Sequence, residues 1–354
     1  MSSERKRVLI LGGGGFIGFG LTKFLTEHRD YDLTVADDFS SNGRDDEFDA
    51  YCAQHHVRVI EGDLSQAETY QKLDGSYDHV YVLASVVGVN RCIEAPVDVV
   101  RINTQIILNT MAWAEKGGAG RLLFASSSEN YAATTELFDY SIPTPEEVPL
   151  CVADTRHPRF TYALTKMLGE SAFFNFGRVE GIPTTIVRYQ NIYGPRMGFK
   201  HAVPHIVERF AKGEDPFHIY GPTQTRAFGY ISDAAECTAL AMESEKSEQQ
   251  VYHIGNDQEV TIEHVTRAIG DLMGYSGTYV SDKTYPGSVS RRCPDITKAR
   301  TELDYEPQVP LEEGLQKTVD WYRRFFESGN AITVGGFQPP EALSYQDEQK
   351  DGGA

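Results

Sequence analysis

The feature that most constrains the fold is a regular alternation of two sequence patterns over the first 190 residues. Short apolar runs are separated by longer stretches in which apolar residues recur with helical spacing. The short runs are VLIL, DLTVADD, VRVIEGD, HVYVLAS, RLLFASSS and TTIVRYQNIYG, and the main helical stretches cover about 16–28, 97–115 and 161–181. Strands joined by helices predict a parallel sheet with helices on both faces. We therefore expect an α/β chain built on a doubly wound parallel sheet.

The regularity weakens after Pro195, where turn-rich pieces separate shorter elements. A helix at about 205–212 lies among short strands such as FHIY and AFGYI, and LEEGLQKTVDWYRRFFE forms the last helix. We expect 1–190 to form the sheet domain, with 231–256 returning to it, and 191–330 to form a smaller α/β substrate-binding lobe. Residues 331–354 are polar and contain several glycines, which predicts a flexible tail.

Composition excludes some partners. The net charge of -18 over 354 residues argues against nucleic acid or an anionic membrane surface, because both attract basic patches. The five cysteines include no C-x-x-C pair that would suggest a metal site, so we expect no bound metal and a reducing, cytoplasmic location. The apolar run near the N-terminus breaks into glycines too early for a signal or spanning segment.

A glycine-rich loop joins the first strand to the first helix. In VLILGGGGFIGFG, Gly12 allows a tight turn, Gly15 a close approach of a pyrophosphate, and Gly18 close packing of helix on strand. A flexible turn would explain the glycines equally well, but Asp37 ends the next strand at the place where an acid binds the ribose of NAD and repels the 2′-phosphate of NADP. This context predicts a Rossmann domain with NAD as its cofactor. The candidate cofactor site also includes Phe16, Ile17, Leu64 and Asp63, although a turn aspartate is almost as good an interpretation of Asp63.

A second pattern is YALTK, in which Tyr162 and Lys166 lie four residues apart and share one face of a helix. A phenol is a poor base at neutral pH, and an adjacent ammonium together with a positive nicotinamide ring would favour the phenolate. The spacing alone is common on ordinary solvated helices, so it gains weight only beside other motifs.

A third pattern is FASSSENYA, where an apolar strand ends in serines and a carboxylate. Ser127 and Glu129 follow this strand at the edge of the sheet where open α/β folds bind ligands. The serine could also merely cap the following turn. Glu129 is the more informative residue, because a carboxylate there supplies a second acid or base.

Together these motifs resemble the extended short-chain dehydrogenase/reductase family of nucleotide-sugar epimerases, dehydratases and decarboxylases. The resemblance spans about 7–327 through GGGGFIG, GDL, SSSENYA, YALTK, RYQNIYGPRM, QTRAFGYISD and RRCPDITKA. S-S-E before N-Y, GPRM, QTRAF and R-x-PDI resemble most the branch that decarboxylates UDP-glucuronate.

The resemblance implies a role for each matching residue. Tyr162 takes the proton of the sugar 4-OH while C4 passes hydride to NAD, Lys166 holds the ribose, and Ser127 binds the 4-oxygen. Glu129 and Arg292 act at C5 and C6, and Arg292 also lies close to the diphosphate. The remaining positions implied for a UDP-sugar are Ser128, Asn191, His205, Tyr220 and Arg226. The family likeness further implies a homodimer, formed through the helix of Tyr162 and the helix at about 97–115.

Alternatives remain open at this point. Glu129 also suits a nucleotide-sugar 4,6-dehydratase, where it would take the C5 proton, and a 4-epimerase or a non-catalytic NAD-binding sensor are further readings. Several positions depart from the family pattern: Leu11, Val82, Ala132 and His205. His205 stands where the decarboxylases carry an asparagine that binds the nucleotide, so an N-acetylated uronic acid or another nucleotide sugar is a possible substrate.

Overall fold

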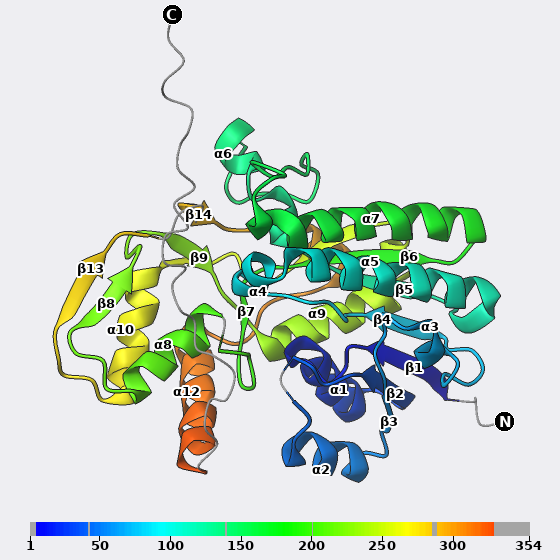
Figure 1. Cartoon of the computed structure of the whole chain (residues 1–354), viewed down its shortest axis with the longest axis horizontal. Coiled ribbons are helices and arrows are strands. Elements are labelled where there is room, and N and C mark those ends of the chain that lie inside the picture. The colour runs from blue at the N-terminus through cyan, green and yellow to red at the C-terminus, as the bar shows by residue number, and fades with distance from the viewer. Residues whose placement is uncertain (1–4, 42, 139, 200, 285–288, 329–354) are drawn as a thin grey trace, which may run out of the picture.

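A computed structural model describes residues 5–41, 43–138, 140–199, 201–284 and 289–328. A seven-stranded sheet forms the centre of the larger lobe, with all neighbouring strands parallel and the order β11-β6-β5-β4-β1-β2-β3 (Figure 1). Its strands are β1 (Lys6–Leu11), β2 (Tyr31–Asp37), β3 (Arg58–Glu61), β4 (His79–Val82), β5 (Leu122–Ser127), β6 (Thr184–Tyr189) and β11 (Val251–Ile254). The predicted doubly wound parallel sheet is confirmed.

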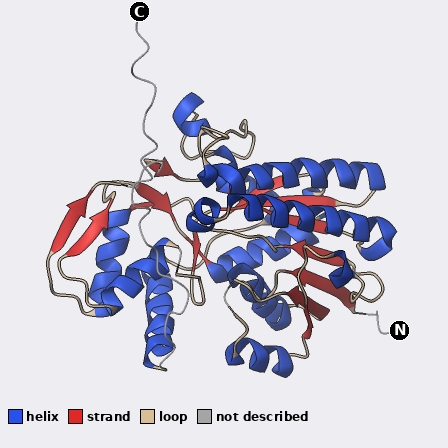
Figure 2. Cartoon of the chain, in the orientation of Figure 1, coloured by secondary structure: helices blue, strands red, loops and turns tan. Residues whose placement is uncertain are grey.

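Helices cover both faces of this sheet (Figure 2). The larger lobe contains α1 (Phe16–His28), α2 (Asp46–Gln54), α3 (Ala67–Tyr70), α4 (Val89–Glu94), α5 (Pro96–Trp113), α6 (Thr134–Phe138), α7 (Thr161–Glu180), α9 (Ile231–Glu243) and α11 (Thr297–Leu303). Helices α1 and α9 pack together on one face, and α5 and α7 pack together on the other. α11, which the sequence analysis placed in the second lobe, packs against α9 and β11.

The alternation of side chains along the strands explains these two layers. In β1, Val8 and Ile10 join the core under α1 and α9, whereas Leu9 and Leu11 join the core under α5 and α7. All four are fully buried. A strand that is apolar on both sides has to be covered twice, which is why these strands read as continuous apolar runs.

The smaller lobe is built around a separate core. Its elements are β7 (Ile192–Tyr193), α8 (Ala202–Ala211), β8 (Phe217–Tyr220), β9 (Thr225–Ala227), β10 (Gly229–Tyr230), β12 (Glu259–Thr261), α10 (Ile262–Met273), β13 (Tyr279–Asp282), β14 (Arg291–Arg292) and α12 (Leu311–Glu327). Three short sheets, β10-β7, β12-β9-β14 and β13-β8, pack with α8, α10 and α12 around aromatic and aliphatic side chains. This agrees with the predicted smaller α/β lobe.

Two predicted strands are each divided in the structure. The run TTIVRYQNIYG forms β6 and then β7, and AFGYI is shared between β9 and β10. In both cases the chain leaves one sheet and joins another, because β6 pairs with β5 and β11 whereas β7 pairs with β10. The predicted helix at 205–212 begins earlier, at Ala202. The predicted flexible tail, 331–354, lies outside the described residues.

The order of the strands places a crevice beside β1. The chain passes from β1 outward to β2 and β3, and then returns to β4 on the other side of β1. Open α/β sheets bind ligands at the carboxyl ends of the strands where the order reverses in this way. The glycine loop follows β1 at this position.

Candidate active site

The glycine loop has the shape of a cradle that side chains would fill. Gly12 has a φ of +91°, and a Cβ there would lie 2.5 Å from the backbone nitrogen of Ala84 after β4. A Cβ on Gly18 would lie 2.2 Å from the carbonyl oxygen of Gly12, so α1 packs directly on the loop. Gly15 is open, since its Cβ would meet nothing nearer than 3.5 Å. A tight turn, an open approach and a helix beginning at Phe16 fit a dinucleotide pyrophosphate.

Asp37 ties the end of β2 to this loop. It is 9% exposed, and its carboxylate accepts hydrogen bonds from the backbone nitrogens of Gly14 at 2.9 Å and Phe39 at 2.7 Å. Burial raises the pKa of Asp37, although these hydrogen bonds oppose the rise. The acid therefore lies beside the loop, as a ribose-binding residue must.

The other cofactor candidates have ordinary structural contacts. Asp63 is exposed and accepts a hydrogen bond from the backbone nitrogen of Ser65 at 2.8 Å, the geometry of a turn aspartate. Leu64 is buried in the core under α5 and α7. Phe16 and Ile17 open α1 and pack partly buried against the opposite core.

Ser127 and Tyr162 are brought together from β5 and α7. Their side chains form a hydrogen bond, and the Ser127 hydroxyl also accepts from the backbone nitrogen of Glu129 at 3.2 Å. β5 ends at Ser127 and continues as a 3₁₀ turn, Ser128–Tyr131, in which Ser128 is buried. The hydroxyl of a strand end thus meets the phenol of a helix that starts one residue earlier, at Thr161.

Burial dominates the electrostatics of Tyr162 and Lys166. It raises the pKa of Tyr162 far above its usual value, against the effect of the Ser127 hydrogen bond, and it lowers the pKa of Lys166 to about 7. The Lys166 ammonium lies 5.5 Å from the centre of the Tyr162 ring and 4.8 Å from that of Phe124. In the protein alone, the lysine therefore does not produce the phenolate that the sequence pattern suggested.

Glu129 lies in a cluster of arginines. Its carboxylate forms an ion pair with Arg292 of β14 at 2.5 Å, although the two residues are 163 positions apart. Burial alone would raise the pKa of Glu129, but the guanidinium groups of Arg292, Arg159 and Arg226 hold it below its usual value. Burial, and then the neighbouring Arg292, lower the pKa of Arg226 to about 10. Three guanidinium groups around one carboxylate leave an excess of positive charge.

Arg159 is a member of this cluster that the sequence analysis missed. It lies in a 3₁₀ turn, Pro158–Phe160, immediately before α7. Its Nε is buried, and among the described residues no hydrogen-bond partner for this atom is present. The available signal was its position three residues before Tyr162, because residues at that spacing on a helical segment lie near one face.

The remaining substrate candidates lie on the smaller lobe. Asn191 donates to the carbonyl of Ala227 at 3.2 Å, and Arg226 donates to that of Val289 at 2.8 Å. His205 on α8 and Tyr220 at the end of β8 both lie near Arg209. The neighbouring arginine of β14, Arg291, is instead exposed and pairs with Glu259.

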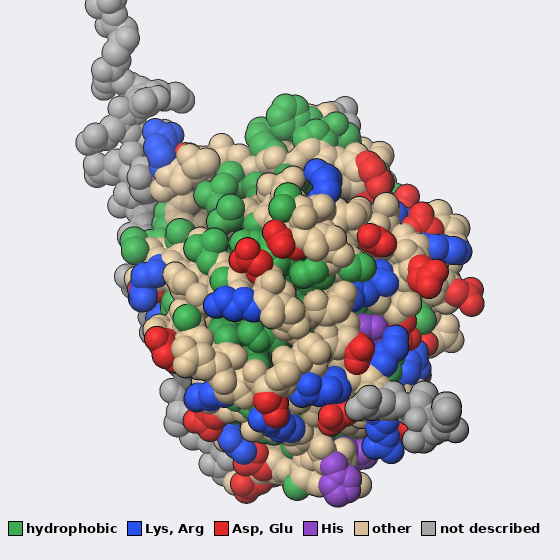
Figure 3. Space-filling model, turned by 90° about the vertical axis from the view of Figure 1, so that its right-hand side faces the viewer, with side chains coloured by type: hydrophobic (Ala, Val, Ile, Leu, Met, Phe, Trp, Pro, Cys, Tyr) green, Lys and Arg blue, Asp and Glu red, His purple; other side chains and the backbone are tan. Residues whose placement is uncertain are grey.

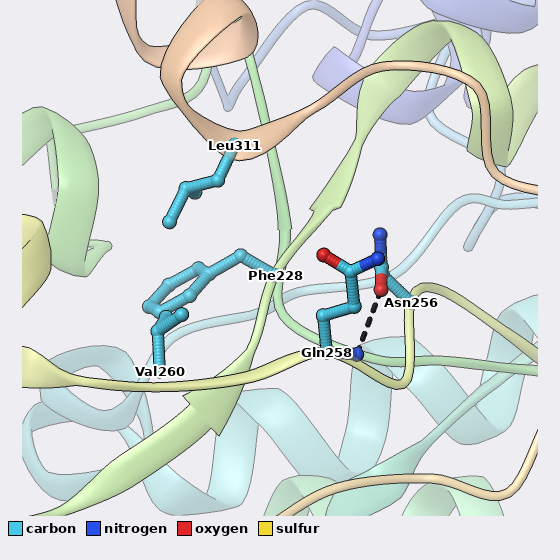
Figure 4. Close-up of a pocket in the computed structure, with 5 residues that line it drawn as sticks. All are labelled: Phe228, Asn256, Gln258, Val260 and Leu311. Carbon is cyan, nitrogen blue, oxygen red and sulfur yellow. Dashed lines mark hydrogen bonds between the residues drawn. The ribbon is translucent and has the colours of Figure 1, made fainter.

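A small pocket lies beside β9 and β12, where Val260 is the strand partner of Arg226 (Figure 4). Phe228, Val260 and Leu311 form its apolar part, and the Asn256 and Gln258 amides form its polar part. The described residues contain no group of three or more His, Cys, Asp or Glu side chains that could hold a metal ion. In the same part of the chain, no helix combines the length and the apolar character needed to cross a membrane.

The NAD dependent epimerase/dehydratase family model matches residues 8–255, which is more than half of the chain. The chain belongs to this family. Its members use NAD, so NAD is the cofactor for which the glycine loop and Asp37 are suited, and the predicted family and cofactor are confirmed.

Relatives extend the likeness over almost the whole chain. A UDP-N-acetyl-alpha-D-glucosaminuronate decarboxylase of Bacillus cytotoxicus is 32% identical over 329 residues, which cover 90% of this chain and 98% of the relative. UDP-glucuronic acid decarboxylase 1 of Xenopus tropicalis is 32% identical over 327 residues, which cover 92% of this chain and 74% of the relative. A crystal structure of UDP-glucose 4-epimerase from Thermotoga maritima superposes with a TM-score of 0.79 at 27% identity, over 90% of this chain and 99% of that one. The chain is therefore an enzyme of the epimerase/dehydratase family.

Proposed function

We propose that this enzyme decarboxylates a UDP-uronic acid, with UDP-glucuronate as the first candidate, through a 4-keto intermediate. The observation that carries the proposal is the cluster of Arg159, Arg226 and Arg292 around Glu129, beside Tyr162. A substrate with a diphosphate and a sugar carboxylate is strongly anionic, and guanidinium groups bind both kinds of anion. The two decarboxylase relatives support this choice of substrate class.

The first step is oxidation at C4 of the sugar. NAD, when bound, supplies the hydride acceptor and a positive charge. Tyr162 removes the proton of the 4-OH, and Ser127, which is hydrogen bonded to Tyr162, holds the same oxygen. Lys166 lies against the Tyr162 ring and favours negative charge on the phenol when it is protonated.

The second step breaks the bond between C5 and C6. With a ketone at C4, the substrate is a β-keto acid, and the electron pair of the breaking bond moves onto the C4 oxygen as CO2 leaves. The hydroxyls of Tyr162 and Ser127 stabilise the enolate as hydrogen-bond donors. Because its pKa is lowered, Glu129 is ionised at neutral pH, so it orients a proton-donating water toward C5 rather than serving as the acid itself. Arg292 fixes the Glu129 carboxylate in this position.

The test is incubation of the protein and NAD with UDP-glucuronate, followed by NMR of the sugar and measurement of CO2. We expect CO2 release and a pentose product, either reduced or as the 4-ketone. A parallel reaction with UDP-N-acetylglucosaminuronate is included because the Bacillus cytotoxicus relative is named for that substrate. A product that retains C6 in both reactions, whether epimerised or dehydrated, would contradict the proposal. Tyr162→Phe should be inactive and serves as the control.

We propose a homodimer formed through α5 and α7. These helices expose large hydrophobic side chains that a monomer would leave in water, with Val97 75% exposed and Val179 79% exposed. The two helices also expose Val100, Leu108 and Leu168. Figure 3 shows exposed hydrophobic side chains gathered in the upper half of its view. Light scattering should give twice the monomer mass, and Val97→Asp should shift it toward the monomer. A wild-type protein of monomer mass at micromolar concentration would contradict the proposal.

We also propose a reducing, cytoplasmic location. The structure has five free cysteines, and four of them are buried. Secretion of the protein with intact activity into an oxidising compartment would contradict this.

A further inference from the structure

A buried carboxylate lies behind the strand end that carries Ser127 and Glu129. Glu170 of α7 is 4% exposed, and its carboxylate accepts four hydrogen bonds from buried partners. One oxygen accepts from the Ser126 hydroxyl at 2.6 Å, from the Asn130 amide at 2.8 Å and from Arg188 at 2.8 Å. The other oxygen accepts a second hydrogen bond from Arg188, also at 2.8 Å.

The partners of Glu170 bracket the candidate catalytic residues. Ser126 immediately precedes Ser127, and Asn130 immediately follows Glu129. The Asn130 amide also donates to the Ser126 hydroxyl at 2.9 Å, so both ends of the segment are fixed to one point. Glu170 itself lies one helical turn beyond Lys166 on the same face of α7.

The same network reaches the strand of Arg292. Arg188 donates to the backbone carbonyl of Glu146 at 2.8 Å. Two residues earlier, the backbone of Thr144 accepts from Asp295 at 2.8 Å and donates to Cys293 at 2.9 Å, which follows Arg292. The ion pair of Glu170 and Arg188 therefore joins α7 and the ends of β5 and β6 to the segment beside β14.

We propose that Glu170 is a positioning residue, which holds Ser127 against Tyr162 and Glu129 against Arg292. This rests on the proposed function, in which those pairs act together. A buried ion pair is weak evidence for a purely stabilising role, since apolar side chains of similar volume often stabilise a core as well. Hydrogen bonds fix direction as well as distance, so the four that the Glu170 carboxylate accepts hold Ser126, Asn130 and Arg188 in one arrangement.

The test compares Glu170→Gln with a matched control, Glu243→Gln. Glu243 also accepts two hydrogen bonds from one arginine, Arg29, and one from a hydroxyl, that of Tyr31, but this group lies at the amino end of β2, opposite the site. In Glu170→Gln, an amide NH2 group replaces one carboxylate oxygen. This donor then faces a donor of Arg188, and the hydrogen bond between them is lost. We expect kcat to fall by about tenfold to a hundredfold with KM changed by about twofold at most, because small displacements of reacting groups have effects of this size. Glu243→Gln should keep the wild-type kcat.

A second readout does not depend on activity. Amide hydrogen exchange followed by mass spectrometry should be faster in peptides covering 126–131 of Glu170→Gln than in those of the wild type, and unchanged there in Glu243→Gln. Loosening of the Ser127 hydrogen bond would also raise the pKa of Tyr162, so the acid limb of the kcat profile should move to higher pH. If Glu170→Gln does not fold, Ser126→Ala removes two hydrogen bonds, the one donated to Glu170 and the one accepted from Asn130, without changing charge. It should still lower kcat by about threefold to tenfold, about 1 kcal/mol.

The outcomes separate the two proposals. If the wild type releases no CO2 from either uronic acid, the proposed function fails, and faster exchange in 126–131 still supports the role of Glu170. If the wild type decarboxylates and the kcat and exchange of Glu170→Gln match those of Glu243→Gln, the positioning role is overturned. A wild-type kcat in Ser126→Ala overturns it as well.

Discussion

Replacement of Lys166 by methionine should make the cofactor-free protein more stable while abolishing its activity. Lys166 is 3% exposed, and burial lowers its pKa from 10.5 to about 7. Methionine has a similar length and no charge to desolvate, so the variant loses the cost of burial and keeps most of the packing. The same ammonium is proposed to hold the ribose and tune Tyr162, so its removal eliminates turnover.

The size of the effect follows from the two pKa values. Keeping Lys166 buried at pH 7 costs about 4 kcal/mol of folding free energy. On folding, the lysine must either lose its proton or keep the charged ammonium out of water, whereas in the unfolded chain it stays protonated and hydrated. The ring contacts with Phe124 and Tyr162 favour the charged form and offset about 1 to 2 kcal/mol of this. The net gain expected for Lys166→Met at pH 7 is therefore about 2 to 3 kcal/mol.

The sign of the pH dependence is fixed by the lowered pKa. Above pH 10.5 the lysine is neutral in both states and the cost is absent. As the pH falls from 10.5 to about 7, the unfolded chain binds a proton that the folded protein resists, so wild-type stability decreases until the pH passes the folded pKa. The advantage of Lys166→Met should consequently be largest at pH 7 and below, fall to about 1.4 kcal/mol at pH 9.5, and be close to zero only above pH 10.5.

The assay is urea unfolding of NAD-free protein at several pH values, followed by fluorescence. Lys23→Met is the matched control, since Lys23 also lies over two aromatic rings, those of Phe19 and Tyr51, but its side chain is 37% exposed. The control should be neutral or slightly destabilised at every pH. A Lys166→Met protein that is less stable than the wild type at pH 7, or whose advantage is independent of pH, would refute the reasoning.

Three further predictions concern the site. Arg292→Met should lower kcat/KM by about tenfold to a hundredfold, the fold-change that corresponds to the free energy of one charged hydrogen bond. The same substitution should raise the pKa of Glu129, so the acid limb of the pH–rate profile should move to higher pH. Gly18→Ala should lower both the melting temperature and the NAD affinity measured by calorimetry, because the new Cβ would lie 2.2 Å from a backbone oxygen. Gly15→Ala should keep the melting temperature and lower only the NAD affinity. Arg159→Met should raise the KM for the UDP-uronic acid more than it lowers kcat in steady-state assays, and an unchanged KM would exclude it from substrate binding.

Local patterns were sufficient where neighbours in sequence are also neighbours in space. The glycine loop, the strand end at Ser127 and the Tyr162 helix each depend on a few consecutive residues, and each was found from the sequence. Glu170 could have been found in the same way, because it continues the spacing of Tyr162 and Lys166 by one more helical turn. It was missed because a glutamate on a helix is usually a solvated residue.

Other features could not be obtained from local patterns. The resemblance named Arg292 as a site residue, but its ion pair with Glu129 depends on β14 pairing with β9 in the smaller lobe. The division of two predicted strands could not be foreseen for the same reason, since apolar alternation indicates a strand without indicating which sheet it joins.

The sequence by itself determined which chemical groups are available, namely an NAD-binding loop, the serine, tyrosine and lysine to which we assign oxidation at C4, and the glutamate to which we assign a further step. Periodicity and turn residues fix these elements locally, so their order along the chain is enough to predict them. Tertiary structure alone decided their electrostatics. Burial lowers the pKa of Lys166 and raises that of Tyr162, and three arginines from distant segments keep Glu129 ionised. Such effects depend on distance and on exclusion of water, which no short stretch of sequence contains.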